Sequence, residues 1–211
     1  MQTLRIVSRL IAECLPTMHA ARRQALTDVC HSAVCGNWLS LSTLALGTNR
    51  ATSLRHRVKC VARLLGNTHL HQERQDIYAA LAHRWLGGLP QLLIVVDWST
   101  LSGDMQWHWL RASVVLEGRS VTLYEEVHPR RLLANRGVHQ RFIERLSQMM
   151  PAMDRPPIVL TDAGFRTTWF QLLARHGWSW VGRIRNRDFV SQSKDQWFPA
   201  KALYARAKKE P

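Results

Sequence analysis

Apolar residues recur at helical spacing through the first part of the chain, where runs of β-branched residues are absent. The clearest case is 52–65, in which one predicted helix face carries four apolar residues: Leu54, Val58, Val61 and Leu65. No strand-like pattern interrupts this spacing before Leu89-Pro90. We therefore predict an all-α region over residues 1–88.

A basic stripe runs along the same predicted helix. Arg55, Lys59 and Arg63 are spaced four residues apart, and an apolar stretch over 39–46 and a turn-like Gly47-Thr48-Asn49-Arg50 precede the helix. A helix, a short turn and a helix with a basic face form the arrangement of a helix-turn-helix DNA reader. The segment 39–65 is therefore a candidate for that motif, with five candidate DNA-contacting residues: Arg50, Arg55, Arg57, Lys59 and Arg63. A plain helical bundle with a basic solvated face explains the pattern equally well.

Beyond Leu89-Pro90 the pattern changes to short apolar runs separated by turns and by amphipathic helices. Glu117-Gly118-Arg119 suits a hairpin turn. After Asn186 the chain becomes polar and basic, and only a short helix around 201–208 is predicted there. The predicted strands cover 91–96, 107–116, 120–127, 158–160 and 178–184, and the predicted helices cover 138–150 and 167–176.

The order of these elements predicts a mixed sheet. Three strands joined by short turns form an antiparallel meander, whereas strands separated by helices add in parallel. Because the meander grows on one side of the first strand, the fourth strand becomes the parallel neighbour of the first on its other side. We predict an α/β core with flanking helices over 89–211, preceded by the all-α region.

The charge of the chain indicates its binding partner. The chain has 29 Lys and Arg residues against 15 Asp and Glu residues, for a net charge of +14, and most of the basic residues are arginine. Arginine binds phosphate through a planar two-pronged set of donors, so nucleic acid is the favoured partner. An arginine-rich proteome from a GC-rich genome is the alternative explanation.

Other classes of protein fit the sequence less well. The longest unbroken apolar run, Leu92–Val96, is too short to span a bilayer, so we expect no membrane association and a cytoplasmic location. The four cysteines lack the paired spacing of a zinc site and are interpreted as reduced thiols.

Two carboxylates stand at equivalent places in the predicted sheet. Asp97 ends the first strand and Asp162 ends the fourth, so the parallel arrangement brings them together at one edge. Two like charges at short range are unfavourable unless a cation bridges them. Oxygen ligands in a phosphate-seeking surround indicate Mg²⁺ or Mn²⁺, as in two-metal phosphoryl transfer. Alternatively, each Asp caps the turn that follows it.

Three strings, LLIVVDWS, IVLTDAGFR and WSWVGRIRNR, together resemble the DDE transposases of the insertion-sequence-four family, the group of the Tn-ten and Tn-five transposases. The resemblance covers about residues 35–190. It implies a helical DNA-binding N-terminal region and a ribonuclease H-like core that cuts transposon ends and joins them to target DNA with Mg²⁺. It also implies a bacterial, nucleoid-associated protein whose homodimer pairs two ends in a synaptic complex.

The resemblance assigns roles to individual residues. Asp97 and Asp162 match the first two acidic metal ligands of the family. A basic stretch close to the DNA backbone is matched by Arg183, Arg185 and Arg187, and Arg166 adds a phosphate contact.

The third acid of the family has no match. It should be a Glu in a signature of Tyr, two residues, Arg, three residues, Glu, six residues and Lys. Tyr204, Arg206 and Glu210 come near, but the first spacing is short and no Lys follows. We therefore expect a truncated, catalytically incomplete copy in which a missing helix leaves three aromatic residues partly exposed: Trp169, Phe170 and Trp180.

Two alternatives remain open. A self-contained ribonuclease H-like nuclease would complete the metal site with Glu144 beside Asp97 and Asp162. A non-catalytic remnant would bind transposon ends without cutting them.

Overall fold

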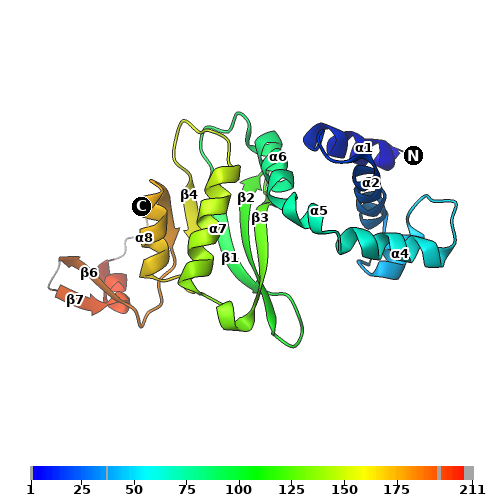
Figure 1. Ribbon diagram of the computed structural model, residues 1–211. Coiled ribbons are helices and arrows are strands. Elements are labelled where there is room, and N and C mark those ends of the chain that lie inside the picture. Colours follow the sequence, from blue (N-terminus) through cyan, green and yellow to red (C-terminus); the bar gives the residue numbers. More distant parts are fainter. Residues whose placement is uncertain (1, 37, 194–195, 207–211) are drawn as a thin grey trace. The chain divides into compact units, whose positions relative to one another are not determined.

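The computed structural model describes residues 2–36, 38–193 and 196–206 (Figure 1). The chain divides into two compact units, Met1–Trp85 and Leu86–Pro211. Within the described residues, no helix combines the length and the apolar character that crossing a membrane requires.

The first unit is all helical. Its second to fifth helices begin after short connections, and three of these starts are capped by polar side chains: Ser40, Ser53 and Asn67 each accept a hydrogen bond from a backbone N–H of the first turn. The helices are α1 (Gln2–Cys14), α2 (Ala20–Cys35), α3 (Leu41–Leu46), α4 (Leu54–Leu65), α5 (Thr68–Gln72) and α6 (Arg74–Leu86), the last of which ends on the first residue of the second unit.

The predicted helix over 52–65 is α4, and only the middle of its apolar face is buried. Val61 is buried against Leu44 and Ala45 of α3. Leu54 and Leu65, at the two ends of α4, are 42% and 48% exposed. The cause is length, because α3 has only six residues and covers only the middle of α4.

The second unit contains a five-stranded mixed sheet in the order β3-β2-β1-β4-β5. β1 pairs antiparallel with β2 and β2 with β3, whereas β4 is parallel to both β1 and β5. The predicted α/β fold is confirmed and is consistent with a ribonuclease H-like core. The strands are β1 (Leu93–Thr100), β2 (Trp107–Leu116), β3 (Arg119–Pro129), β4 (Ile158–Thr161) and β5 (Ser179–Gly182).

The connections explain why these elements form where they do. Glu117 and Gly118 both have positive φ angles, 49° and 75°, which matches the tight turn predicted between β2 and β3. A short 3₁₀ helix (Arg130–Leu132) follows β3, and Asn135 then caps α7 (Arg136–Met149). After β4, α8 (Thr167–Arg175) leads through Gly177 into β5.

Helices α7 and α8 pack on the same face of the sheet (Figure 1). On this face α7 buries Val138, Phe142, Leu146 and Met149, which recur at helical spacing. The opposite face exposes Leu93 and Val95 of β1 and Val181 of β5.

The expectation of partly exposed aromatic residues is correct only in part. Trp180 is 46% exposed and Phe170 is half-buried. Trp169 is only 1% exposed, so the prediction for this residue was wrong. The reason is that α8 turns Trp169 inward, where its ring contacts Phe165 and His139.

The segment after Asn186 contains structure that the sequence did not predict. A two-stranded antiparallel sheet is formed by β6 (Phe189–Ser193) and β7 (Gln196–Pro199). The strands have only five and four residues, too short to show a clear alternating pattern. The helix predicted around 201–208 is a 3₁₀ helix over Ala200–Arg206 in the described residues, and Glu210 lies outside them.

Candidate active site

Asp97 and Asp162 follow the last register pair that β1 and β4 share. That pair is Val96 and Thr161, so the next residue on each chain is the aspartate. Adjacent strands in a sheet lie about 4.8 Å apart. Both aspartates are exposed, and the predicted parallel pairing of the first and fourth strands is confirmed.

Each carboxylate is oriented by a local hydrogen bond. The Ser99 hydroxyl donates to Asp97 Oδ2 at 2.7 Å, and the Gly164 backbone N–H donates to Asp162 Oδ1 at 2.8 Å. In the part of the chain that the structure describes, the remaining oxygens, Asp97 Oδ1 and Asp162 Oδ2, accept no hydrogen bond. Exposed carboxylate oxygens of this kind are the ligands that Mg²⁺ and Mn²⁺ prefer, so this pair fits such an ion.

A third ligand is missing from the described residues. Among them, no group of three His, Cys, Asp or Glu side chains is placed to hold a metal ion. Glu144 lies on α7 and accepts a hydrogen bond from Gln140 at 2.9 Å. The described residues do not bring Glu144 together with Asp97 and Asp162 in a group that could hold a metal ion, because α7 packs on the sheet face away from Asp97.

Arginine side chains gather beside Asp162. A hollow of about 580 Å³ is lined by Asp162 and by three of the predicted arginines, Arg183, Arg185 and Arg187. An adjoining hollow of about 390 Å³ contains the same three arginines together with Arg166. The structure thus brings four of the predicted DNA-contacting residues to one edge of the sheet, next to one of the two aspartates.

Backbone contacts hold this basic edge in place. The Arg183 N–H donates to the carbonyl oxygen of Thr161 at 3.0 Å, which continues the pairing of β5 with β4 up to the residue before Asp162. The Arg185 N–H donates to the Asp188 carboxylate at 2.6 Å. All three arginine side chains remain exposed.

The basic residues of the first unit divide into two groups. Arg55, Lys59 and Arg63 are exposed on α4. In contrast, Arg50 pairs with Asp28 at 2.6 Å. Arg57 donates to the carbonyl oxygens of Leu46, the last residue of α3, and of Thr48 in the turn, at 3.4 and 3.3 Å. The second group therefore joins the turn to α2 through Arg50, and α4 to the end of α3 and the turn through Arg57.

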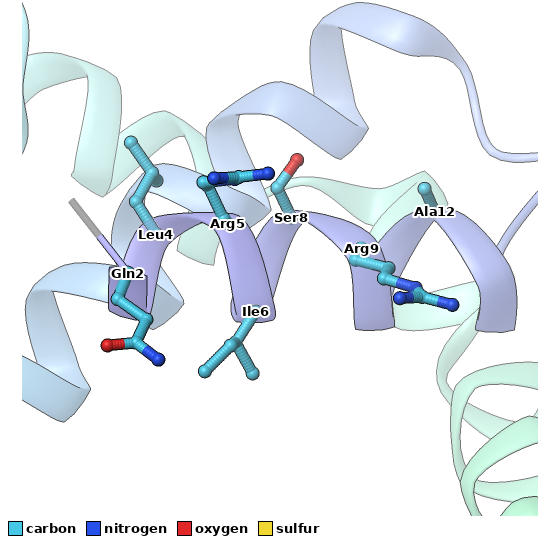
Figure 2. Close-up of a pocket in the computed structure, with 7 residues that line it drawn as sticks. All are labelled: Gln2, Leu4, Arg5, Ile6, Ser8, Arg9 and Ala12. Carbon is cyan, nitrogen blue, oxygen red and sulfur yellow. The ribbon is translucent and has the colours of Figure 1, made fainter.

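A further hollow, of about 930 Å³, lies on α1 far along the sequence from the aspartates (Figure 2). It is lined by residues of α1 alone, including Arg5, Ile6 and Arg9. No acidic residue, cysteine or histidine lines it, so it contains none of the groups that catalyse hydrolysis or hold a metal.

One polar cluster near the aspartates was missed from the sequence. His139 is buried in the first turn of α7, and the Trp98 indole N–H donates to its Nε2 atom at 3.0 Å. Burial, and secondarily the nearby charge of His128, lowers the pKa of His139 to about 4. The spacing of His139 from Phe142 and Ile143 is helical, which is the sequence signal that would have placed it on the buried face.

A second buried group lies behind the first. Glu126 on β3 accepts hydrogen bonds from Tyr124, Arg145 and His128, at 2.6, 2.5 and 2.8 Å. Burial by itself would raise the pKa of Glu126, but these three donors together outweigh it and lower that pKa. The carboxylate is therefore a charged, fully paired part of the structure rather than a metal ligand.

Comparison with known proteins identifies the family of the unit that contains this mixed sheet. No curated protein matches the chain. A family model described as the transposase DDE domain matches residues 88–207, which is more than half of the chain and includes the whole sheet. The chain therefore belongs to the transposase DDE domain family.

Proposed function

We propose that this chain is a DNA transposase of the insertion-sequence-four group, which acts on transposon ends and target DNA. The observation that carries the proposal is that Asp97 and Asp162 directly follow the last residue pair shared by β1 and β4, and that Arg183, Arg185 and Arg187 line a hollow with Asp162. DDE transposases generally use divalent metal ions, and a carboxylate pair next to a basic hollow suits a phosphodiester substrate.

Asp97 and Asp162 would hold the divalent cation. When bound, such an ion polarises a phosphoryl oxygen and favours formation of a nucleophile at neutral pH. The chain's own residues orient the two carboxylates through Ser99 and Gly164. Arg183, Arg185 and Arg187 would neutralise the DNA backbone, since guanidinium groups bind phosphate oxygens with two parallel hydrogen bonds.

The first unit supplies the second DNA contact in this proposal. Its α3–turn–α4 segment would act as a helix-turn-helix, with Arg55, Lys59 and Arg63 facing DNA and Arg50 and Arg57 holding the turn through the contacts described above. Two copies would pair two transposon ends.

A separate part of the proposal concerns whether the acidic metal site is complete. Within residues 2–36, 38–193 and 196–206, Asp97 and Asp162 follow paired residues of adjacent strands, and no third acid forms a metal-holding group with them. We infer that the chain by itself is catalytically incomplete. The alternative function, a DNA-binding remnant that occupies transposon ends without cutting them, is favoured by the same observation.

Binding to the DNA that flanks the chain's own reading frame tests the function. Duplexes carrying the inverted repeats of that flank should be bound more tightly than shuffled duplexes of equal length. Fe²⁺ in place of Mg²⁺, with a reductant and peroxide, should cleave the bound duplex close to the metal. Asp97→Asn and Asp162→Asn should abolish this cleavage and leave binding intact. Equal binding of both duplexes would contradict the proposal.

A further inference from the structure

The imidazole of His139 contacts β1 at Trp98, the residue after Asp97. It is 4% exposed, and the Trp98 indole N–H donates to its Nε2 atom at 3.0 Å. An indole nitrogen can only donate a hydrogen bond. The Nε2 atom of His139 is therefore unprotonated, and the neutral ring carries its proton on Nδ1.

The same ring contacts the segment that follows β4. Phe165 stacks on it with ring centroids 5.4 Å apart and an interplanar angle of 27°. Trp169 meets it edge-on at 5.0 Å and 73°. Phe165 and Trp169 also contact each other, with centroids 4.6 Å apart. One buried side chain of α7 thus joins the two segments in which the aspartates lie.

The contacts lie on the side of the sheet away from the carboxylates. Successive residues of a strand point to opposite faces, so Trp98 faces α7 while Asp97 faces the open side. After β4, Asp162 is exposed and Phe165, three residues later, is buried. His139 therefore contacts both segments from behind and leaves their carboxylates free.

We propose that His139 is a positioning residue that sets the spacing of Asp97 and Asp162 by holding Trp98 and Phe165. The proposal rests on the metal-binding function proposed above. The groups that hold and orient metal ligands typically change metal affinity by 10- to 100-fold when they are removed, because the ligands lose their preset geometry. His139 acts on both ligands in this way without touching either.

Titration of the full chain with Mn²⁺ by calorimetry tests the positioning role. His139→Phe keeps a ring but loses the acceptor, and Trp98→Phe keeps a ring but loses the donor. Each should weaken Mn²⁺ binding about 10-fold or more. Because both remove the same hydrogen bond, the double variant should be no weaker than either single one. His139→Gln, whose side-chain oxygen can accept from Trp98, should recover part of the affinity.

A matched control separates positioning from general loss of stability. Phe142→Leu removes packing on the same helix, where Phe142 contacts Tyr124, and it leaves Trp98 and Phe165 untouched. It should lower the melting temperature and leave Mn²⁺ affinity unchanged. If His139→Phe binds Mn²⁺ as the wild type does, or if Phe142→Leu weakens binding equally, the positioning role is wrong.

Hydrogen exchange without metal distinguishes this proposal from the proposed function. His139→Phe should speed backbone exchange in both 97–100 and 162–166, whereas Phe142→Leu should not. Unchanged exchange in these two segments would overturn the positioning role. A wild-type chain that binds no Mn²⁺ would instead overturn the proposed function, and the exchange measurement would still decide whether His139 holds both segments.

Discussion

Val96 and Thr161 are paired across two parallel strands, and each is followed directly by an aspartate. The backbone register of β1 and β4 therefore places the two aspartates level with each other where the pairing of these two strands ends. Like charges so placed repel unless a cation lies between them, which makes metal binding the property to measure first.

Replacing either aspartate by asparagine should greatly weaken binding of Mn²⁺, because the ion loses one of its two charged ligands. Calorimetric titration of the purified chain measures this effect. Asp154→Asn removes one exposed carboxylate outside the pair and serves as the control, which should bind Mn²⁺ as the wild type does. Wild-type affinity in Asp97→Asn or in Asp162→Asn would show that the pair is not a shared site.

Replacing Arg55, Lys59 and Arg63 together by Gln should flatten the salt dependence of DNA binding. Each phosphate contact contributes roughly 0.9 to the slope of log affinity against log salt concentration on duplex DNA. The triple variant should therefore lose up to about three such contributions, as measured by fluorescence anisotropy over a salt series.

The control for this variant removes the same charge elsewhere. The second unit offers three exposed arginines near the starts of β3, β4 and β5, at the opposite ends of these strands from the aspartates: Arg119, Arg155 and Arg175. Their replacement by Gln should change the slope much less. Equal slopes for the two triple variants would mean that net charge, and not the α4 stripe, sets DNA affinity.

The purified chain should bind DNA and fail to join a pre-cut transposon end to target DNA in Mg²⁺ or Mn²⁺. Displacement at phosphorus needs both the attacking and the leaving oxygen to be stabilised, and among the described residues no third acid forms a metal-holding group with Asp97 and Asp162. A gel assay for joined product measures the outcome. Efficient joining would show that a residue outside the described part of the chain completes the site.

Stability should fall as the pH falls from 6.5 towards 4 because of His139. The folded state holds the pKa of His139 at about 4, mainly through burial and further through the charge of His128 on β3, whereas the unfolded value is 6.5. In this window the unfolded chain binds a proton that the folded chain does not, which costs on the order of 3 kcal/mol in total. Urea denaturation at several pH values measures it, and His139→Phe should flatten the curve above pH 4.5.

Glu126 affects stability in a different pH range, so its contribution can be measured separately from that of His139. Its folded pKa lies below the usual value, so it stabilises the fold at higher pH and this contribution is lost only as the pH falls through the lowered pKa. A slope between pH 6.5 and 4.5 that persists in His139→Phe would show that another group is responsible.

Gly182→Ala should destabilise the second unit by about 1–3 kcal/mol, because the space that the added methyl group needs is already occupied. A Cβ atom on Gly182 would lie 2.4 Å from the ring of Phe170, which is itself packed on Trp180. Gly103→Ala is the matched control, since its Cβ would meet nothing within 4 Å. Thermal unfolding compares the two, and equal melting temperatures would contradict the close approach.

The sequence by itself determined the elements of the core and the place of the aspartates in it. The strands that carry Asp97 and precede Asp162 could be predicted because alternation, turn residues and apolar runs are local signals. The end of the first strand was wrong, because pairing with β2 extends β1 past Asp97 to Thr100. The order of the elements then made the first and fourth strands neighbours, because crossover rules leave few ways to connect them. Helix α7 was predicted with its buried face for the same reason, since its apolar residues repeat at helical spacing.

Only the tertiary structure decided which side chains meet. His139 joins the residues after Asp97 to those after Asp162, contacts that span three separate elements and leave no local pattern in the sequence. The burial of Trp169, the exposure of Leu54 and Leu65, and the separation of Glu144 from the aspartates depend equally on how the helices pack. Periodicity describes one element at a time, whereas burial and contact depend on the length and position of its neighbours, which the local pattern does not contain.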